Sequence, residues 1–565
     1  MRNSISFCLG LLTCLTLQHP LQAAEQVNLT FKEKKLVTIS AKNLNEFVKT
    51  GEIPTELQTL SKLGDAETLK LFRNVLQLPI PSGIRTIGFI AYAPWSSKLL
   101  AHFSKVLYTP NPDSIENRVA TLKQAITAIS QEKESWTIAD FITAFPSQEV
   151  NLDLDELLKI KSVASIIYRN GSAFQAISAQ ATLEEKSLKS FNPANLPDLN
   201  QKGKYTVRRE VSELTVLPKI LDQLPKTRLA KAFLPYLADV PQKNTRKVIF
   251  FPEGIDKPVP IVIFSTGLGG TESNKPQNEL AEHIASYGYA VVTFEPIGSQ
   301  LSNSSLLLDF KFSPLIGYTE FVARPQEISI VLDELEELTK NDPTWANRIN
   351  IKQVAVVGYS QGGSSALAVA GADIDGSQLQ KECSRSSLMP SLSWYLQCEM
   401  RLWSKQNYHL QDQRIKAAIA VSPMTSTLFS PDSFKSIKLP LLVVTASHDT
   451  TTPPVIEQII PFTQLNNAHK YLLAISPGNH YSTGGNPAGA PFGFGGDDTL
   501  KRPENQNTAR QFYIALAVAF LQVHLRQDSS YAPYLTSAYA RYLSRNVPIK
   551  IELIQSLAEK DIATP

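Results

Sequence analysis

Apolar and polar residues follow two different patterns along this chain, and the change between them divides it in two. Up to about residue 180, apolar residues mostly recur every three or four positions, as on one face of a helix. From about residue 205, short β-branched runs alternate with amphipathic segments. The pattern predicts a mainly helical N-terminal domain, followed by a domain of alternating strands and helices. The clearest helical stripe consists of Ile115, Val119, Leu122, Ile126 and Ile129.

Helix start signals in the first part support this division. Thr137 precedes Asp140 by three residues, and Asp113 precedes Glu116 in the same way, which is the form of a capping box. Residues 27–39 look extended and are the exception. Further helices are expected over residues 151–160 and 163–177.

The domain boundaries follow from these patterns. Residues 25–180 form the mainly helical domain. Residues 181–204 contain Asn-Pro, Leu-Pro and Asn-Gln-Lys-Gly, which favour turns and predict a linker. Residues 205–565 form the second domain, and residues 371–413 interrupt its rhythm as a cap or lid would.

The second domain is expected to be a doubly wound, mostly parallel α/β sheet with right-handed crossovers. Ligands of such sheets bind beyond the carboxyl ends of the strands. The predicted helices cover residues 278–287, 325–339 and 510–525. The predicted strands cover residues 205–211, 247–251, 260–265, 289–294, 354–359, 415–421, 439–445 and 470–475, and no later strand is expected.

Residues 354–367 carry the most informative motif of the chain. A β-branched run leads into Gly358-Tyr359-Ser360-Gln361-Gly362, and small residues that suit a helix follow. This strand, tight turn and helix is the context of a nucleophile elbow, which raises a serine hydroxyl above the end of a parallel sheet. The alternative is a chance Gly-x-Ser-x-Gly in a buried turn, so the flanking motifs decide.

Two later strands supply the partners that a serine nucleophile needs. A hydroxyl requires a base within hydrogen-bond reach, and the base must be oriented by a carboxylate. Asp449 follows the strand near residues 441–446, and His480 follows the strand near residues 471–475. Ser360, Asp449 and His480 therefore end three separate strands in the order nucleophile, acid, base, which is the order of α/β-hydrolases.

Each of these assignments has an alternative. Asp449 could serve only as the cap of the following helix, and His480 could be an ordinary loop histidine. The substitute acids would be Asp432 and Glu457. Other histidines suit the role of base less well because of where they lie along the chain: His448, His469 and His283.

An oxyanion hole requires two backbone N–H groups directed at the developing charge. Gln361, directly after Ser360 at a helix N-terminus, is expected to supply one. Leu268, within the glycine-rich segment 266–270, is the candidate for the other. A phosphate-binding loop is disfavoured there, because the lysine of a P-loop and the spacing of a dinucleotide fingerprint are both missing.

Composition fits a globular protein large enough for more than one domain. The chain has 565 residues, of which 43% are hydrophobic and 19% charged. The formal net charge of +3 gives no reason to expect nucleic acid or an anionic membrane as a partner. No transmembrane span is expected in the mature chain, and the oligomeric state is left open.

The N-terminus predicts export. Arg2, the apolar run 5–17 and Gln22-Ala23-Ala24 have the form of a signal peptide, residues 1–24. A lipoprotein signal at Cys14 fits poorly, because Thr13 is unusual there and Cys14 lies within the apolar run. The mature protein would then be periplasmic or secreted.

Cysteine content agrees with export. Once the signal peptide is removed, Cys383 and Cys398 remain, and both lie in the predicted cap. In an oxidising compartment they are candidates for a disulfide, the alternative being two free buried thiols. Neither has the neighbours of a metal site, so no metal is expected.

The chain resembles exported, cyanobacterial-type α/β-hydrolases that carry the N-terminal domain called DUF1400. Its second half is similar to the platelet-activating-factor acetylhydrolase and dienelactone hydrolase branch of that fold. One position departs from many of those relatives, which have histidine where this chain has Thr266. The resemblance rests on residues 263–270, 282–292 and 324–328, on the elbow at Ser360, and on the segments that end in Asp449 and His480.

The resemblance implies the α/β-hydrolase fold and ester hydrolysis without a metal or organic cofactor. The expected substrate is a small carboxylic ester, short-chain or lipid-like, and Trp394 and Tyr395 of the cap could line an acyl pocket or form a small core. Two alternatives stay open. The same three residues could serve a peptidase or acyltransferase, or the hydrolase half could be an idle scaffold whose N-terminal domain binds an envelope partner.

Overall fold

The chain divides into two units, Met1–Ala164 and Ser165–Pro565. Residues 1–22, which carry most of the predicted signal peptide, lie outside the described residues. The computed structural model describes residues 23–32, 34–58, 69, 72–73, 76–77, 79–81, 96–110, 114–132, 135–159, 161–187, 192–222, 244–268, 270, 275–302, 318–385, 391–403, 407–449, 451–484 and 503–562.

The first unit is mixed α/β rather than mainly helical. Its described strands β1 (Gln26–Phe31), β2 (Lys34–Ser40), β6 (Glu149–Asp153) and β4 (Leu107–Tyr108) form a sheet in the order β2-β1-β6-β4. A small antiparallel pair joins β3 (Pro79–Pro81) to β5 (Ser135–Thr137). The helical elements are α1 (Ala41–Thr50), η1 (Thr55–Leu57), α5 (Ser96–Val106), α6 (Ile115–Glu132), α7 (Ile138–Thr143) and α8 (Leu154–Lys159).

Strand β6 shows why the helical prediction is wrong for part of this unit. The sequence pattern predicts a helix from residue 151, but β6 pairs in parallel with β1 and the helix α8 begins only at Leu154. The partner strand lies more than a hundred residues earlier in the chain, so local periodicity gives no sign of the pairing. The expected extended segment 27–39 forms the hairpin β1–β2. The capping box of Thr137 and Asp140 is present at the start of α7, whereas Asp113 lies outside the described residues.

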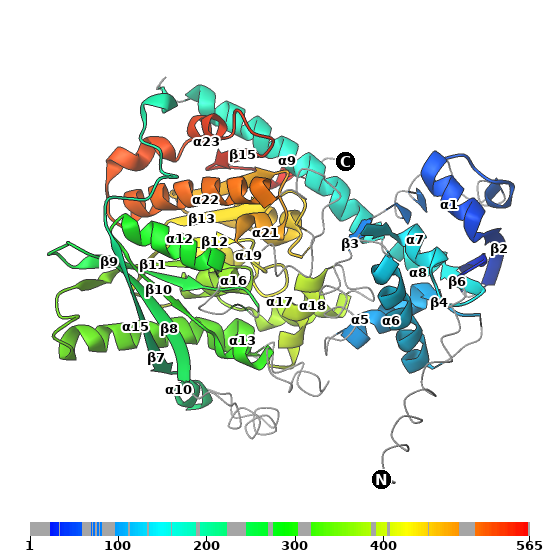
Figure 1. The fold of residues 1–565 in the computed structure, drawn as a ribbon, viewed down its shortest axis with the longest axis horizontal. Helices are drawn as coiled ribbons and strands as arrows, with labels where there is room; N and C mark the ends of the chain where they lie inside the picture. The colour runs from blue at the N-terminus through cyan, green and yellow to red at the C-terminus, as the bar shows by residue number, and fades with distance from the viewer. Residues whose placement is uncertain are drawn as a thin grey trace, which may run out of the picture. The chain divides into compact units, whose positions relative to one another are not determined.

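The second unit is built on a large, mostly parallel sheet (Figure 1). Its described strands lie in the order β15-β14-β13-β12-β11-β9-β10-β8-β7. The strands from β14 to β10 run parallel, whereas β15, β8 and β7 are each antiparallel to the neighbour through which they join the sheet. The strands are β7 (Val207–Thr215), β8 (Asn244–Pro252), β9 (Val259–Ser265), β10 (Ala290–Phe294), β11 (Ile349–Tyr359), β12 (Ile415–Val421), β13 (Leu441–Ala446), β14 (Lys470–Ser476) and β15 (Lys550–Ile554).

Strand β15 corrects the expectation that the strand at residues 470–475 is the last strand along the chain. It is a five-residue edge strand that pairs antiparallel with β14 after a long helical interval. Such a short segment has too few residues to show a period, and only its pairing with β14 identifies it.

Helices cover both faces of the large sheet, because buried strands carry apolar residues on both sides. Helices α12 (Lys275–Ser286) and α22 (Pro503–His524) share a hydrophobic core with alternate residues of the central strands. Figure 1 shows α15 (Arg324–Asn341) across the sheet from α22. The remaining helical elements are η2 (Pro193–Asn195), α10 (Leu217–Asp222), α13 (Ile297–Ser302), η5 (Thr319–Ala323), α16 (Gln361–Val369), α19 (Pro431–Ser436), η7 (Val455–Ile459), α20 (Ile460–Gln464), α21 (His480–Thr483), η10 (Ser529–Tyr534), α23 (Ser537–Leu543) and α24 (Glu559–Ile562).

The division between the units differs from the expected boundary at residue 180. Helix α9 (Lys161–Ser187) continues past that residue and past the start of the expected linker. Its later part belongs to the second unit, because Arg541 donates to the carbonyl of Ser178 at 2.9 Å and pairs with Glu185 at 2.9 Å. Polar residues of α9 thus contact Arg541 of the second unit, whereas the sequence pattern assigned the residues after 180 to a linker.

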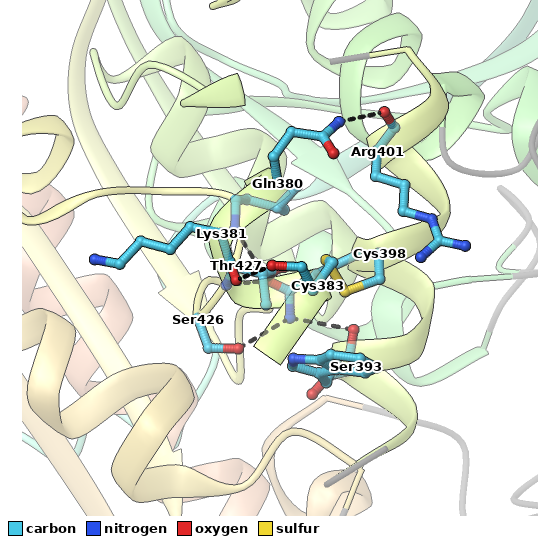
Figure 2. The surroundings of a disulfide bond; sticks show 12 residues. Gln380, Lys381, Cys383, Ser393, Cys398, Arg401, Ser426 and Thr427 are labelled. Atoms are coloured by element: carbon cyan, nitrogen blue, oxygen red, sulfur yellow. Dashed lines mark hydrogen bonds between the residues drawn. A yellow bond between two sulfur atoms is a disulfide. The ribbon is translucent and has the colours of Figure 1, made fainter. Parts of the chain in front are cut away.

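The expected cap, residues 371–413, contains two helices joined by a disulfide. Helix α17 (Gly376–Arg385) carries Cys383, helix α18 (Leu392–Cys398) ends in Cys398, and a 3-10 turn, η6 (Glu399–Leu402), follows. Figure 2 shows the bond between the two helices, together with Gln380, whose side chain donates to the carbonyl of Arg401 at 2.7 Å. The structure thus joins the two cysteines that the sequence suggests as a pair.

Within the described part of the chain, no helix combines the length and apolar character that crossing a membrane requires. Helix α22 is long and largely apolar, and its central residues are buried in the core of the second unit.

Candidate active site

Ser360 lies in a strained turn between β11 and α16. Its backbone angles are φ 58° and ψ −120°, a region that residues with a side chain rarely occupy. The turn is held from a neighbouring strand, because the Ser360 N–H donates to the carbonyl of Val421 at 2.8 Å. Strain of this kind persists only where the surrounding structure imposes it, and it is concentrated at functional sites.

Two glycines make this turn sterically accessible. A Cβ atom at Gly358 would lie 1.9 Å from the carbonyl oxygen of Gly362, and one at Gly362 would lie 2.1 Å from the carbonyl oxygen of Ser265. Strand β11, helix α16 and the end of β9 therefore approach more closely than any side chain allows. The Gly-x-Ser-x-Gly spacing is required by this contact.

The structure brings Ser360, His480 and Asp449 together in one hydrogen-bonded chain. His480 Nε2 lies 3.1 Å from Ser360 Oγ, and His480 Nδ1 lies 2.7 Å from Asp449 Oδ2. A carboxylate only accepts hydrogen bonds, so Nδ1 donates to Asp449 and Nε2 is left to accept from the serine hydroxyl. The three residues follow β11, β14 and β13, whose carboxyl ends lie at one edge of the sheet.

Asp449 is fully buried and is held on both of its oxygens. Oδ1 accepts from the backbone N–H of Thr452 at 2.8 Å, and Oδ2 accepts from the hydroxyl of Thr452 at 2.8 Å as well as from His480. The next helix, η7, has Pro454 at its N-cap and no side-chain cap, so Asp449 closes a turn onto Thr452 and does not cap that helix as the alternative expected. Thr452 is not among the residues that the sequence suggests, although its place three residues after Asp449 is the spacing of a capped turn.

His480 is fixed by its own loop and by Tyr359. Asn479 caps the short helix α21 by accepting from the N–H groups of Tyr481 and Ser482 at 3.0 and 3.1 Å. The Tyr359 hydroxyl donates to the carbonyl of His480 at 3.0 Å, and the two rings lie 5.0 Å apart. Burial raises the pKa of Tyr359 well above its usual value, so this hydroxyl keeps its proton and remains a donor.

The two oxyanion candidates lie on two segments near Ser360. Gln361 is the first residue of α16, where backbone N–H groups have no acceptor within the helix. Leu268 follows Thr266-Gly267 at the end of β9, and a Cβ atom at Gly267 would lie 3.3 Å from Ser360 Cβ. Both segments thus adjoin the serine.

The substitute acids are engaged elsewhere. Asp432 is largely exposed and pairs with Lys435 at 2.8 Å. Glu457 is buried, and its carboxylate accepts from the N–H groups of Thr425 and Ser426 at 2.6 and 2.8 Å. It also accepts from the hydroxyl of Ser393 in the cap helix α18 at 2.5 Å. Glu457 therefore joins the cap to the loop after β12.

The other histidines also have separate partners. His448 contacts the hydroxyl of Ser447 at 2.7 Å, and His283 contacts the carbonyl of Leu199 at 2.9 Å. His469 precedes β14 and lies 5.0 Å from the ring of His524. Of the cap aromatics, Tyr395 is buried and Trp394 is half-buried.

A known family matches part of the chain. Residues 23–153 match the model of a family described as an α/β hydrolase of unknown function, DUF1400. The matched segment lies in the first unit, whereas Ser360, Asp449 and His480 lie in the second. No curated protein matches the chain. The match suggests hydrolase activity: the chain is similar, over its N-terminal part, to a family of α/β hydrolases whose function is unknown.

Proposed function

We propose that the protein is a serine hydrolase that cleaves carboxylic esters. The observation that carries the proposal is the chain of contacts from Ser360 through His480 to Asp449, with Ser360 on a strained backbone at the carboxyl end of a central strand of the sheet. Nucleophile, base and orienting carboxylate are the groups that acyl transfer needs.

In the proposed mechanism, Ser360 Oγ attacks the ester carbonyl while His480 Nε2 takes the hydroxyl proton. Asp449 keeps Nδ1 protonated and stabilises the imidazolium that forms. The backbone N–H groups of Leu268 and Gln361 hold the oxyanion of the tetrahedral intermediate. His480 then gives its proton to the leaving alcohol. In the second half of the reaction, water attacks the acyl carbonyl while His480 Nε2 takes a proton from it, and Ser360 Oγ leaves and takes that proton back from His480. This scheme uses no metal or organic cofactor.

The substrate proposed is a short-chain or lipid-like ester. A peptidase or acyltransferase would use the same three side chains, so the choice of substrate separates these functions. An idle scaffold is disfavoured by the unbroken hydrogen-bond chain, since nothing in folding alone requires a serine on strained backbone beside a histidine.

The test compares the mature chain with Ser360→Ala on p-nitrophenyl esters from acetate to palmitate, with the matching p-nitroanilides beside them. We expect ester turnover that Ser360→Ala abolishes, and a fluorophosphonate label on the wild-type protein only. The acyl-chain length of the best substrate indicates the size of the acyl-binding site. Turnover that survives in Ser360→Ala, or turnover of the anilides alone, would contradict the proposal.

We also propose that the protein acts outside the cytoplasm. The signal-like N-terminus and the bond between Cys383 and Cys398 support this, because disulfides are rare in reducing compartments. Export predicts that the N-terminus of the protein isolated from its host begins near residue 25, and a retained Met1 in a cytoplasmic fraction would contradict it.

A further inference from the structure

Arg324 is a buried cation whose position the proposed mechanism does not use. It is the first residue of α15, and none of its surface is exposed. Removing a guanidinium from water is costly unless hydrogen bonds and an opposite charge replace the solvent. Arg324 Nη2 donates to the carboxylate of Glu320 and, at 3.3 Å, to the hydroxyl of Ser299. These contacts account for only one side of the fork.

The other side of the fork reaches the loop that carries Leu268. Arg324 Nη1 donates to the carbonyl of Thr266 at 2.5 Å and lies 3.5 Å from the carbonyl of Gly267. The Gly267 carbonyl also accepts from the N–H of Gly270 at 3.0 Å. Two consecutive carbonyls of the loop are thus held on one side.

The direction of these carbonyls fixes the direction of the N–H groups. In a trans peptide the C=O and N–H bonds point in opposite directions. A Thr266 carbonyl held by Arg324 therefore orients the N–H of Gly267, and a held Gly267 carbonyl orients the N–H of Leu268. Gly267 itself adjoins Ser360 and Tyr359, since a Cβ atom added to this glycine would lie only 3.1 Å from the Tyr359 ring.

We propose that Arg324 is a positioning residue for the oxyanion loop: its guanidinium holds the Thr266 and Gly267 carbonyls so that the loop presents its N–H groups beside Ser360. The inference rests on the proposed function, because the loop stabilises an oxyanion only if Ser360 attacks a carbonyl. Arg324 acts from behind the loop, through the backbone, and touches no substrate.

A structural ion pair is the competing explanation, and the chain offers a matched control for it. Lys247 of β8 is also a buried cation, and it pairs with Glu334 of the same helix α15 at 2.6 Å. Loss of Lys247 removes the buried cation that pairs with Glu334 of α15 without removing any contact to the loop. A change seen in both the Lys247 and the Arg324 variants therefore reflects the loss of a buried ion pair. A change seen only in the Arg324 variants reflects the loss of its contacts to the loop.

The experiment uses full-length Arg324→Met, Arg324→Lys and Lys247→Met. Amide hydrogen exchange is followed over residues 262–268, and kcat and KM are measured with p-nitrophenyl acetate. For Arg324→Met we expect at least about tenfold faster exchange at Gly267 and Leu268. We also expect about 10²-fold lower kcat with KM within about threefold, the size of a lost oxyanion donor.

Arg324→Lys should give intermediate values of both exchange and kcat, because an ammonium keeps the charge but cannot span both sides of the fork. Lys247→Met should lower the melting temperature and change neither readout. The proposal is overturned if Arg324→Met matches Lys247→Met in both exchange and kcat. If Arg324→Met does not fold, a folded Arg324→Lys with wild-type exchange and kcat overturns it.

The proposed function fails separately. Ester turnover that survives in Ser360→Ala, or no turnover by the wild-type chain, removes the catalytic role without involving any Arg324 variant. The exchange at Gly267 and Leu268 still decides whether Arg324 holds the loop.

Discussion

Replacement of Asp449 by asparagine distinguishes its two contacts, the turn that it closes onto the Thr452 N–H and the hydrogen bond to His480. Asparagine accepts a backbone N–H in a turn of this kind as well as aspartate does. If Asp449 served only to accept from the Thr452 N–H, Asp449→Asn would be nearly silent. The contact at 2.7 Å between Asp449 Oδ2 and His480 Nδ1 predicts a large effect instead.

The geometry fixes how the new amide would sit. The Thr452 N–H donates to Oδ1 at 2.8 Å, so the asparagine oxygen must take that place and its NH₂ group the place of Oδ2. The NH₂ group then faces His480 Nδ1 as a donor, which favours the tautomer with the proton on Nε2. In that neutral tautomer Nε2 carries a hydrogen and has no lone pair free to accept the proton of Ser360. The Thr452 hydroxyl can rotate to accept from the NH₂ group, so the fold is retained.

The expected loss is about 10⁴-fold in kcat, as found when a triad aspartate is made neutral in this way. That factor corresponds to about 5 kcal/mol of transition-state stabilisation. The assay is p-nitrophenyl acetate hydrolysis at pH 7.5, with urea unfolding to check that stability is kept. Thr452→Val is the matched control, because it removes one hydrogen bond from Oδ2 and leaves the carboxylate facing His480; we expect about a tenfold loss. A well-folded Asp449→Asn with kcat within tenfold of wild type would refute this reasoning.

Two further predictions concern buried carboxyl groups. Burial raises the pKa of Glu327 to about 8, so the folded state retains a proton that the unfolded chain loses near pH 4.5. The free energy of unfolding should therefore fall as pH rises between these two values, by at most about 1.4 kcal/mol per pH unit. Glu327→Gln keeps an acceptor for the Ile297 N–H and should flatten this dependence in urea unfolding at pH 5.5 and 7.5; equal slopes would contradict it. Glu457→Ala should cost about 3–5 kcal/mol in urea unfolding, because it leaves the buried N–H groups of Thr425 and Ser426 without their acceptor. A loss below about 1 kcal/mol would show that the cap and the loop after β12 do not depend on this carboxylate.

The sequence alone indicated which strands of the second unit end in the candidate catalytic residues. The β-branched runs before Ser360, Asp449 and His480 predict strands, and each is present as β11, β13 or β14. The glycines flanking Ser360 are equally readable, because close approach of strand and helix excludes any side chain there. Patterns of this kind are local: they depend on residues within about ten positions of each other.

The tertiary structure decided what depends on distant partners. Strand β6 and strand β15 are too short to show a period and exist through pairing with β1 and β14. The place of the unit boundary within α9 follows from contacts of that helix with Arg541, far along the chain.

The same distinction holds at the candidate site. Sequence order suggested Ser360, Asp449 and His480, but not that Tyr359 and Thr452 hold the histidine and the acid, nor that Arg324 reaches the Thr266 carbonyl. Hydrogen bonds of this kind join residues up to about 120 positions apart, as in the contact between Tyr359 and His480. Local patterning predicts which strands end in reactive groups; only the packing of those strand ends determines which further side chains hold the groups in place.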